Sequence, residues 1–397
     1  MRKYVDEAQH LAKVEPVTLE QQTYDAIVVG AGIAGSSFAY FAAKAGSSRI
    51  LIIEREAGFG HHASGRSAET LYELDPIPTV QRLKRLGGDW LRNPPADFSE
   101  HPLLDPTGAL GLFDAEGWAN THPELVRLAQ QGMRLELCSP EQAARRVPLL
   151  NPDAIAGAAW MPEAGALDVY EWHSSYLKHA RQSGVQVLFD TEVTGVLRAG
   201  GRCVGVRTSR GSARAPWVVN AAGAWASPLA CMAEASHIPI TPKRRSAIIY
   251  EPPGDPDMSD WPLVVAADHR LYFQPKATGL LFCPMDEQVM APCDAQPNQL
   301  AIAEGVERLR QLAPNLVPKS IKRSWGGLRS FAPDGVAVVG EDPACPGFFW
   351  LAGQGGCGIE TSPILGPIAA DLILEGRSER FETALLSPKR FLEAGAF

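Results

Sequence analysis

The sequence lacks the features that mark a membrane-spanning, secreted or nucleic-acid-binding protein. No stretch approaches the roughly 18 uninterrupted apolar residues that cross a bilayer, and no run of Lys or Arg offsets the formal net charge of −8. The seven cysteines form no CxxC pair and no metal-type spacing with the histidines. These absences argue against a membrane span, a nucleic-acid partner and a metal site, and they predict reduced thiols in a cytoplasmic protein.

The chain does have enough apolar material for a large folded protein. Its 397 residues are 45 % hydrophobic, which suits roughly two or three domains with buried cores. Residues 1–23 mix charges throughout and lack the apolar region of a signal peptide. We expect them to form an extension that is disordered or loosely docked.

A strand–loop–helix–strand pattern lies between residues 24 and 54. The apolar run 26–29 leads into the glycine-rich motif GAGIAG at 30–35, and a second apolar run ends at Glu54. Glycines at this spacing let the backbone approach a pyrophosphate, and a carboxylate in the position of Glu54 can bind a ribose diol. The pattern predicts a Rossmann-like dinucleotide-binding unit, and the alternative is a glycine-rich turn in an ordinary βαβ unit.

A second glycine-rich loop follows an apolar run near the other end of the chain, at 353–358. Its amides and the start of the following helix would favour negative charge on a bound ring, as develops on a reduced flavin. NAD would need only the first unit, so FAD explains the pair better. Because the two units lie far apart in the sequence, the cofactor domain must be discontinuous.

The intervening sequence predicts short helices and strands. We expect helices at 79–92, 122–132, from 140, 169–184, 297–313 and 364–375. We expect strands at 185–189, 192–198, 203–208, 217–223, 247–250, 263–266, 271–274, 280–283 and 347–352. The fold class is α/β with two domains, a discontinuous Rossmann-like FAD-binding domain and a substrate domain with a mixed or antiparallel sheet. The proposed division is 24–100, 161–222 and 330–397 for the first, and 101–160 and 223–329 for the second.

These motifs resemble the FAD-dependent D-amino-acid oxidase/dehydrogenase family, which includes glycine oxidase and sarcosine oxidase. GAGIAG, SGRSA, VNAAGAW and GFFWLAGQGGCGI are shared across that family, whereas FSEHPLL, PKRRSA and WGGLRSF are narrower and resemble its D-arginine dehydrogenase branch. The likeness covers most of 24–392. It implies non-covalent FAD and oxidative deamination of D-amino acids with basic or large apolar side chains, giving 2-oxo acids and ammonia by hydride transfer from Cα to flavin N5.

Several alternatives stay open beside this resemblance. The substrate could be an N-methyl or secondary amino acid or a 2-hydroxy acid, and the electron acceptor could be a quinone, another carrier or O₂. A non-catalytic FAD-binding or regulatory protein is a further alternative. Thr70 and Asp75 stand where the D-arginine dehydrogenase branch has histidine and tyrosine, and Glu360 replaces a glutamine, which leaves the substrate open.

The resemblance also assigns roles to individual residues. Arg329, with Tyr272, would hold the substrate carboxylate, which the planar guanidinium fork suits. Glu100 would face a cationic side chain, and Glu360 is the candidate base. For Arg329 and Glu100 the alternatives are a structural ion pair and a solvated loop carboxylate. The full substrate set is Tyr72, Asp75, Glu100, Arg245, Val265, Tyr272, Arg329, Gly356 and Glu360.

The cofactor set follows the glycine-rich segments and the loop after Glu54. His61 and His62 in that loop could be site residues, but a solvated pair is preferred. The residues expected to contact FAD are Gly30, Gly32, Ile33, Ala34, Gly35, Glu54, Arg55, Ala63, Ser64, Gly65, Arg66, Ser67, Ala68, Glu69, Thr70, Val193, Ala222, Gly223, Trp225, Gly355, Gly356, Cys357, Gly358, Ile359 and Glu360.

Overall fold

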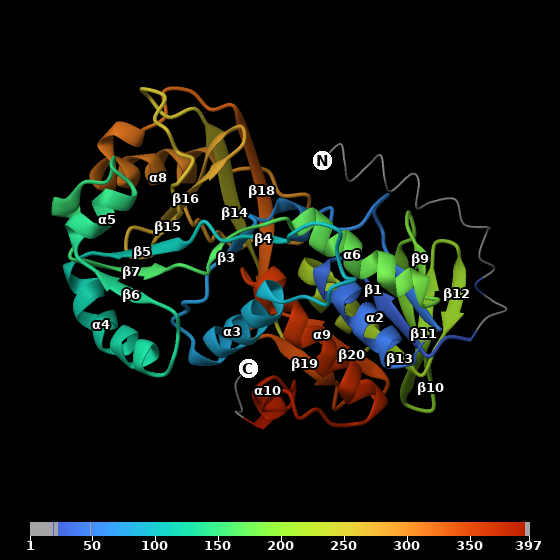
Figure 1. The fold of residues 1–397 in the computed structure, drawn as a ribbon. Coiled ribbons are helices and arrows are strands. Elements are labelled where there is room, and N and C mark those ends of the chain that lie inside the picture. The colour runs from blue at the N-terminus through green and yellow to red at the C-terminus, as the bar shows by residue number, and fades with distance from the viewer. Residues whose placement is uncertain (1–18, 20–22, 48, 394–397) are drawn as a thin grey trace.

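The computed structural model describes residue 19, residues 23–47 and residues 49–393. Two large sheets stand side by side, the six-stranded one at the right of Figure 1 and the nine-stranded one at the left. The α-helices of the described chain are α2 Ile33–Lys44, α3 Pro78–Arg92, α4 Ala115–Gln130, α5 Pro140–Arg146, α6 Val169–Gln182, α7 Ala226–Met232, α8 Gln299–Leu312, α9 Gly358–Leu374 and α10 Arg390–Glu393.

The six-stranded sheet has the order β19-β20-β13-β1-β2-β9, and all its pairs are parallel except β19 with β20. Its strands are β1 Ala26–Val29, β2 Ile50–Ile53, β9 Gln186–Leu188, β13 Trp217–Asn220, β19 Val338–Glu341 and β20 Phe348–Ala352. Consecutive residues of β1 point to opposite faces of the sheet, and Ile27 and Val28 accordingly belong to two different buried clusters. The sheet is therefore covered on both faces, as expected for a parallel sheet.

Helices cover one face of this sheet and a small sheet covers the other. Helix α2 packs against α6 and α9, while the strands β10 Val193–Ala199, β11 Arg202–Thr208 and β12 Gly211–Arg214 form a meander in which β11 contacts β13. The turn between β10 and β11 uses Gly200 and Gly201, both at positive φ, as the glycine pair predicts.

The nine-stranded sheet has the order β21-β18-β14-β17-β16-β15-β5-β7-β6, in which only β15 with β5 is parallel. Its strands are β5 Ala109–Phe113, β6 Glu136–Cys138, β7 Gly157–Met161, β14 Thr241–Tyr250, β15 Leu263–Ala266, β16 Leu271–Lys276, β17 Gly279–Cys283, β18 Arg323–Phe331 and β21 Gln354–Gly355. The α/β fold with a mixed-sheet second unit is therefore confirmed. A fourth, three-stranded sheet is formed by β3 Thr70–Leu71, β4 Leu104–Asp105 and β8 Gly165–Leu167.

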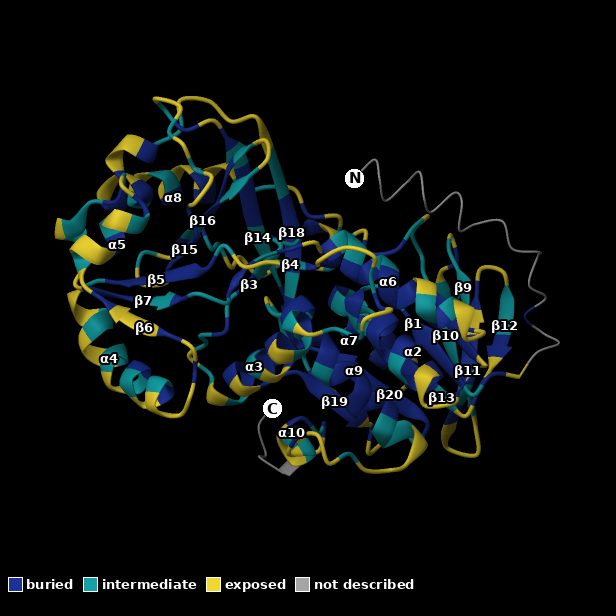
Figure 2. Cartoon of the chain, viewed as in Figure 1, coloured by how far each residue is buried: buried dark blue, intermediate teal, exposed yellow. Residues whose placement is uncertain are grey.

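Burial follows these layers, because most strands of the two large sheets are dark blue in Figure 2, with β6 and β9 among the exceptions, and the outer faces of α4 and α5 are exposed. The domain bounds given above stay a prediction. The expectation for residues 1–23 lies mostly outside the described residues, but Leu19 is buried in a core cluster. Among the described residues, no helix combines the length and apolar content that a membrane span requires.

Three predicted elements have wrong boundaries, and prolines explain them. Helix α4 begins at Ala115, capped by Asp114, because Pro123 lies inside the helix and does not begin it. Helix α9 begins at Gly358 with Pro363 and Pro367 in its interior. Strand β14 begins at Thr241 and includes a proline, and β18 was not predicted as a strand at all.

Candidate functional site

One cleft lies where β1, β2 and β13 end and where α2 and α9 begin. Its walls carry both glycine-rich loops, the segment after Glu54 and one strand of the nine-stranded sheet. The cofactor residues predicted from sequence that line it are Gly30, Gly32, Ile33, Ala34, Glu54, Arg55, Ala63, Ser64, Ser67, Val193, Ala222, Gly223, Trp225, Gly355, Gly356, Gly358 and Ile359.

The two cleft-lining glycines of the first loop differ in what requires them. Gly30 has φ +108°, and a Cβ there would lie 2.5 Å from the carbonyl oxygen of Ala221, the residue that follows β13. The close approach of these two backbone segments therefore requires glycine at position 30. Gly32 has ordinary backbone angles, and a Cβ there would make only an ordinary contact with Ser64. The added carbon would instead occupy the cleft, which is the space a pyrophosphate needs.

Glu54 links the end of β2 to this loop. Its Oε2 accepts a hydrogen bond from the Ala31 N–H at 2.8 Å, and its Oε1 accepts one from the Glu56 N–H at 2.9 Å. Burial raises the pKa of Glu54, and these two N–H groups partly offset that shift. Each carboxylate oxygen keeps a second lone pair, so the geometry still fits a ribose diol.

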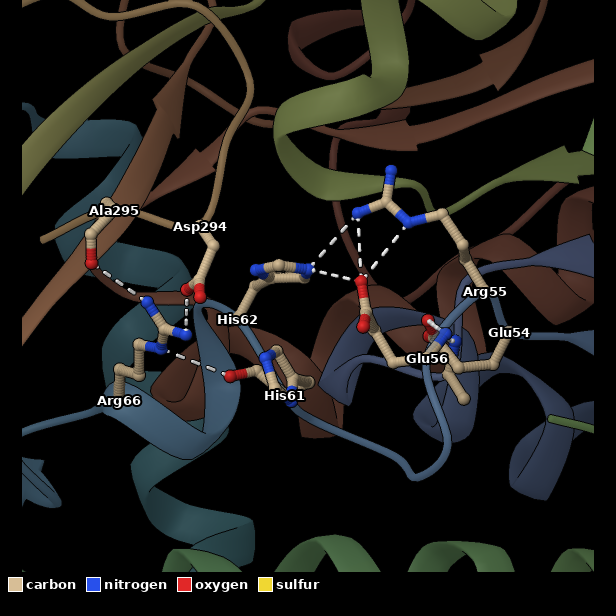
Figure 3. Close-up of polar contacts among 9 residues, drawn as sticks. Glu54, Arg55, Glu56, His61, His62, Arg66, Asp294 and Ala295 are labelled. Carbon is tan, nitrogen blue, oxygen red and sulfur yellow. Dashed lines mark hydrogen bonds and ion pairs between the residues drawn. The ribbon is translucent and has the colours of Figure 1, made fainter. Parts of the chain in front are cut away.

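The residues after Glu54 form a polar cluster at the cleft edge (Figure 3). Arg55 donates to Glu56 Oε1 at 3.0 and 3.1 Å, and the His62 Nε2 lies 2.9 Å from the same oxygen. The Arg55 guanidinium also stacks 4.2 Å from the Trp225 ring centroid. His61 is exposed, as expected, but the expectation that His62 is solvated is wrong, because its side chain is half-buried against Trp225.

Glu56, His61 and His62 have ligand atoms close enough to share a cation. Arg55 lies in hydrogen-bonding range of both Glu56 and His62, so a positive charge already occupies this cluster. Electrostatic repulsion from the guanidinium opposes a metal ion there. Burial lowers the pKa of His62, with Glu56 acting in the opposite direction.

The loop 63–70 enters the cleft only in part. The Ser64 hydroxyl accepts a hydrogen bond from the Ile33 N–H at 3.0 Å and so satisfies one group at the start of α2. Arg66 turns away and donates to the Ala295 carbonyl and to Asp294 (Figure 3). It also donates to the Gly326 carbonyl at 2.9 Å. The predicted cofactor residues that do not line the cleft are Gly35, Gly65, Arg66, Ala68, Glu69, Thr70, Cys357 and Glu360.

A row of side chains crosses one face of the nine-stranded sheet. In the observed register Arg329 stands opposite Lys243, two residues from Arg245 on the same strand face. Tyr272 stands directly between Cys283 on β17 and Val265 on β15. Directly opposed residues share a face, so Arg329, Arg245, Cys283, Tyr272 and Val265 all face the same side. Arg329 also lines the cleft, which joins this row to the second glycine-rich loop.

The two arginines of the row have different partners. Arg245 pairs with Glu287 at 2.8 Å, and Lys243 shares that carboxylate at 3.1 Å. Arg329 donates only to carbonyl oxygens, those of Leu328 at 3.3 Å and Arg66 at 3.0 Å, and no carboxylate of the described chain forms an ion pair with it. A guanidinium without a carboxylate partner can still donate two parallel hydrogen bonds to the carboxylate of a ligand.

Tyr272 lies beside both cations of this row. Burial and the neighbouring Cys283 raise the pKa of the Tyr272 phenol, while Arg245 and Arg329 lower it. The net pKa is well above the ordinary value, so the phenol stays protonated and can donate a hydrogen bond. Arg329 stays charged, although burial lowers its pKa, because a guanidinium does not deprotonate in proteins.

Tyr72 and Glu360 are in contact with each other beyond the Tyr272 end of the row. The Tyr72 N–H donates to Glu360 Oε1 at 2.7 Å, and Glu360 Oε2 lies 3.8 Å from Lys84. Lys84 also lies 3.6 Å from Asp75. Burial, partly offset by Lys84, raises the pKa of Glu360 to about 7. The Glu360 carboxylate is thus turned toward α3, and it is not among the residues that line the cleft.

Glu100 is not brought together with the other predicted substrate residues. Its side chain is 81 % exposed and pairs with Lys178 at 3.5 Å. This matches the alternative given above, a solvated loop carboxylate. Cys357 lies in the second glycine-rich loop but does not line the cleft, and burial raises the pKa of its thiol to about 12.

Sequence reasoning missed Lys84 and part of the cleft. Helical spacing was the available signal for Lys84, which shares the buried face of α3 with Val80, Gly87 and Leu91. The additional residues that line the cleft are Val29, Ile53, Gly60, Thr191, Glu192, Ala221, Ala224, Pro228, Leu229, Met232, Leu328, Ser330 and Gln354, along with His61 and His62.

The chain is similar to several known proteins, at low sequence identity. The chain is 25 % identical to the bovine (Bos taurus) FAD-dependent oxidoreductase domain-containing protein 1, over 94 % of this chain and 85 % of that protein. It is 26 % identical to the hydrogen cyanide synthase subunit HcnC of Pseudomonas aeruginosa, over 89 % and 93 %. It is also 26 % identical to the mouse (Mus musculus) pyruvate dehydrogenase phosphatase regulatory subunit, but it spans only 43 % of that protein.

Solved structures share the fold. The L-proline dehydrogenase from P. horikoshii superposes with a TM-score of 0.84 at 24 % identity, covering 95 % of this chain and 99 % of that one. The glycine oxidase from Geobacillus kaustophilus gives a TM-score of 0.80 at 22 % identity, covering 92 % and 98 %.

The family model of the FAD dependent oxidoreductases, DAO, matches residues 25–372. This range contains both glycine-rich loops, Glu54 and the row from Arg329 to Val265. The residues that line the cleft fit FAD. Gly32 and Gly356 have no side chains to fill the cleft, and Glu54 places a carboxylate at its edge. The chain therefore belongs to the DAO family of FAD-dependent oxidoreductases and uses FAD as its cofactor.

Proposed function

We propose that this protein oxidises D-amino acids to 2-oxo acids and ammonia. The observation that carries the proposal is Arg329, a cleft-lining cation without a carboxylate partner among the described residues, beside the glycine-rich loop that contains Gly356. A free carboxylate is the ligand that a guanidinium in such a site binds best. The D configuration is supported by the narrower motifs FSEHPLL, PKRRSA and WGGLRSF.

The residues of the chain would bind and orient the substrate. Arg329 would hold the carboxylate in a bidentate pair, and the protonated Tyr272 would donate to it, with Arg245 adding positive charge on the same sheet face. FAD, when bound, supplies the acceptor for the hydride that leaves Cα. The glycine-rich segments, Glu54 and Ser64 would hold the cofactor so that its reactive ring lies near Arg329.

No side-chain base is needed for this reaction. The substrate ammonium can lose its proton to water before oxidation. Glu360 is a weak candidate for the role, because its carboxylate is held by the Tyr72 N–H and Lys84. The role of Glu100 as a partner for a cationic side chain is likewise not supported by its exposed position.

Secondary amino acids are a second candidate substrate class. The high TM-score to an L-proline dehydrogenase favours this alternative, since proline is a secondary amine. Product analysis separates the two classes, because only primary amines release ammonia. A regulatory role, suggested by the pyruvate dehydrogenase phosphatase regulatory subunit, would instead give a flavoprotein that no amine reduces.

The test is anaerobic mixing of the flavin-loaded protein with a panel of D- and L-amino acids. Loss of the visible absorption band of oxidised flavin reports the reaction. We expect reduction by D-amino acids with release of ammonia. Reduction by proline or N-methyl amino acids alone, without ammonia, would overturn the proposal in favour of the second class.

A further inference from the structure

Lys84 is a buried cation that the proposed reaction does not use. It is 5 % exposed, and its Nζ donates to the Leu74 carbonyl at 3.0 Å. The same ammonium lies 3.6 Å from Asp75 Oδ2 and 3.8 Å from Glu360 Oε2. Burial alone would lower the pKa of Lys84, but its neighbours, Glu360 first and Asp75 among them, outweigh burial and raise that pKa, so the ammonium stays charged.

This charged cluster lies directly behind Tyr72. The Lys84 Nζ is 5.5 Å from the Tyr72 ring centroid, and the Tyr72 N–H donates to Glu360. On the other side, the Tyr72 hydroxyl lies over Gly111, where a Cβ would approach it to 2.8 Å. Gly111 stands opposite Val265, and Val265 stands opposite Tyr272. Tyr72 therefore forms a wall beyond Tyr272, on the side away from Arg329.

The wall itself is apolar. Tyr72, Leu74 and Tyr272 pack against a hydrophobic cluster that contains Val265 and Phe113. A substrate whose carboxylate binds Arg329 would extend its side chain along the row toward these residues. An ammonium or guanidinium placed there would lose its hydration without gaining a partner.

The carboxylates near this wall are already engaged. Asp75 Oδ1 accepts a hydrogen bond from the Ile77 N–H at 3.0 Å, and its Oδ2 faces Lys84. Glu360 is held as described above. Asp268, whose charge also reaches Tyr72, is exposed and accepts from the Asp114 N–H at 3.1 Å.

We propose that Lys84 is a specificity-determining residue, and that by pairing with Asp75 and Glu360 behind Tyr72 it restricts the enzyme to amino acids with apolar side chains. This inference rests on the proposed function and narrows its substrate class. Basic amino acids are disfavoured because their charge would enter an apolar wall whose neighbouring carboxylates already have partners.

The first test uses the wild-type holoenzyme and two substrates of matched shape. D-norleucine and D-lysine differ only in the terminal ammonium. We expect anaerobic flavin reduction by D-norleucine to have a second-order rate constant larger than that of D-lysine by about tenfold or more. Equal or faster reduction by D-lysine would overturn the inference. If Glu100→Ala then removed that activity, the cation site would lie at Glu100.

Variants test the role of Lys84 itself. Lys84→Met removes the charge at similar length and frees two carboxylates, so the D-lysine to D-norleucine ratio should rise about tenfold. The triple variant Lys84→Met, Asp75→Asn, Glu360→Gln should restore the wild-type ratio. Lys322→Met removes an exposed ion pair with Glu251 as a matched control and should leave the ratio unchanged. An unchanged ratio in Lys84→Met would overturn the assignment.

Two further outcomes keep the test decisive. If Lys84→Met does not fold, Glu360→Gln is the second variant, because it leaves the Lys84 charge less compensated and should lower the D-lysine ratio further. A higher ratio in Glu360→Gln would overturn the inference. Flavin that no D- or L-amino acid reduces would overturn the proposed function together with this inference, whereas a preference for D-lysine overturns the inference alone.

Discussion

Tyr72 donates its backbone N–H to the Glu360 carboxylate at 2.7 Å, across 288 positions of sequence. This hydrogen bond ties the segment after β3 to the first turn of α9, and so connects the wall beyond Tyr272 with the second glycine-rich loop. The cofactor cleft and the face of the nine-stranded sheet are thereby held in one arrangement.

Glu360→Gln should change how stability depends on pH. Burial raises the folded-state pKa of Glu360 to about 7, above its value in an unfolded chain. The folded state therefore binds the proton more tightly, and wild-type stability falls as pH rises from about 4.5 to about 7. Glutamine removes this loss while still accepting from Tyr72.

We therefore expect Glu360→Gln to gain stability relative to wild type as pH rises across that interval, by up to about 3 kcal/mol. Urea unfolding at pH 5 and pH 8 measures the difference. A difference in unfolding free energy that is the same at both pH values would contradict the raised pKa.

Gly30→Ala and Gly32→Ala should separate folding from cofactor binding. Gly30→Ala forces a Cβ against the Ala221 carbonyl at positive φ, so the apoprotein should lose at least about 2 kcal/mol of stability. Gly32→Ala leaves apoprotein stability within about 0.5 kcal/mol, because its Cβ meets no crowded atom, but it should weaken FAD binding. Thermal unfolding and flavin titration of the two apoproteins measure this. Equal losses of FAD affinity at unchanged stability in both variants would count against the geometry.

Asp342 is expected to stabilise the fold through its buried hydrogen bonds. It is buried and accepts from the N–H groups of Ser236, Ala344 and Cys345 and from the Trp350 indole at 2.8 Å. Asp342→Asn replaces an acceptor by a donor and should destabilise the fold by about 3 kcal/mol. Trp350→Phe removes one donor and should cost less. Urea unfolding compares the two, and a smaller loss in Asp342→Asn than in Trp350→Phe would refute this role.

The prediction of the cofactor half of the site depended on local patterns. The two glycine-rich loops and Glu54 carry their signal in short stretches, and the structure brings them to one cleft. The substrate half depended on strand register, which local patterns do not encode. The row from Arg329 to Val265 exists because β18, β14, β17, β16 and β15 pair in one register, and β18 itself was not predicted as a strand.

Pairing between distant charges was equally hidden in the sequence. Nothing near Glu360 indicates that Lys84 would face it, although the helical spacing of α3 places Lys84 on the buried face. Glu100 was assigned by resemblance to a motif, and its surface position shows that a matching motif does not fix where a side chain points. Pro123, Pro363 and Pro367 lie inside α4 and α9, where a proline usually interrupts a helix, and the predicted start of each helix was therefore too late.

Arg329→Ala should remove substrate binding without removing FAD. Loss of two charge-assisted hydrogen bonds to a carboxylate lowers the second-order rate constant of flavin reduction by about a hundredfold or more. Arg329→Lys should recover only part of it, since an ammonium lacks the planar fork. Arg380→Ala, which removes an exposed ion pair with Asp371, is the matched control and should react like wild type.

The most direct measurement is therefore anaerobic flavin reduction in wild type and Arg329→Ala, with D-amino acids as reductants. The account predicts rapid bleaching in wild type with release of ammonia, and slow bleaching in Arg329→Ala with an unchanged flavin content. Bleaching at the same rate in both proteins, or none with any D-amino acid in wild type, would contradict it.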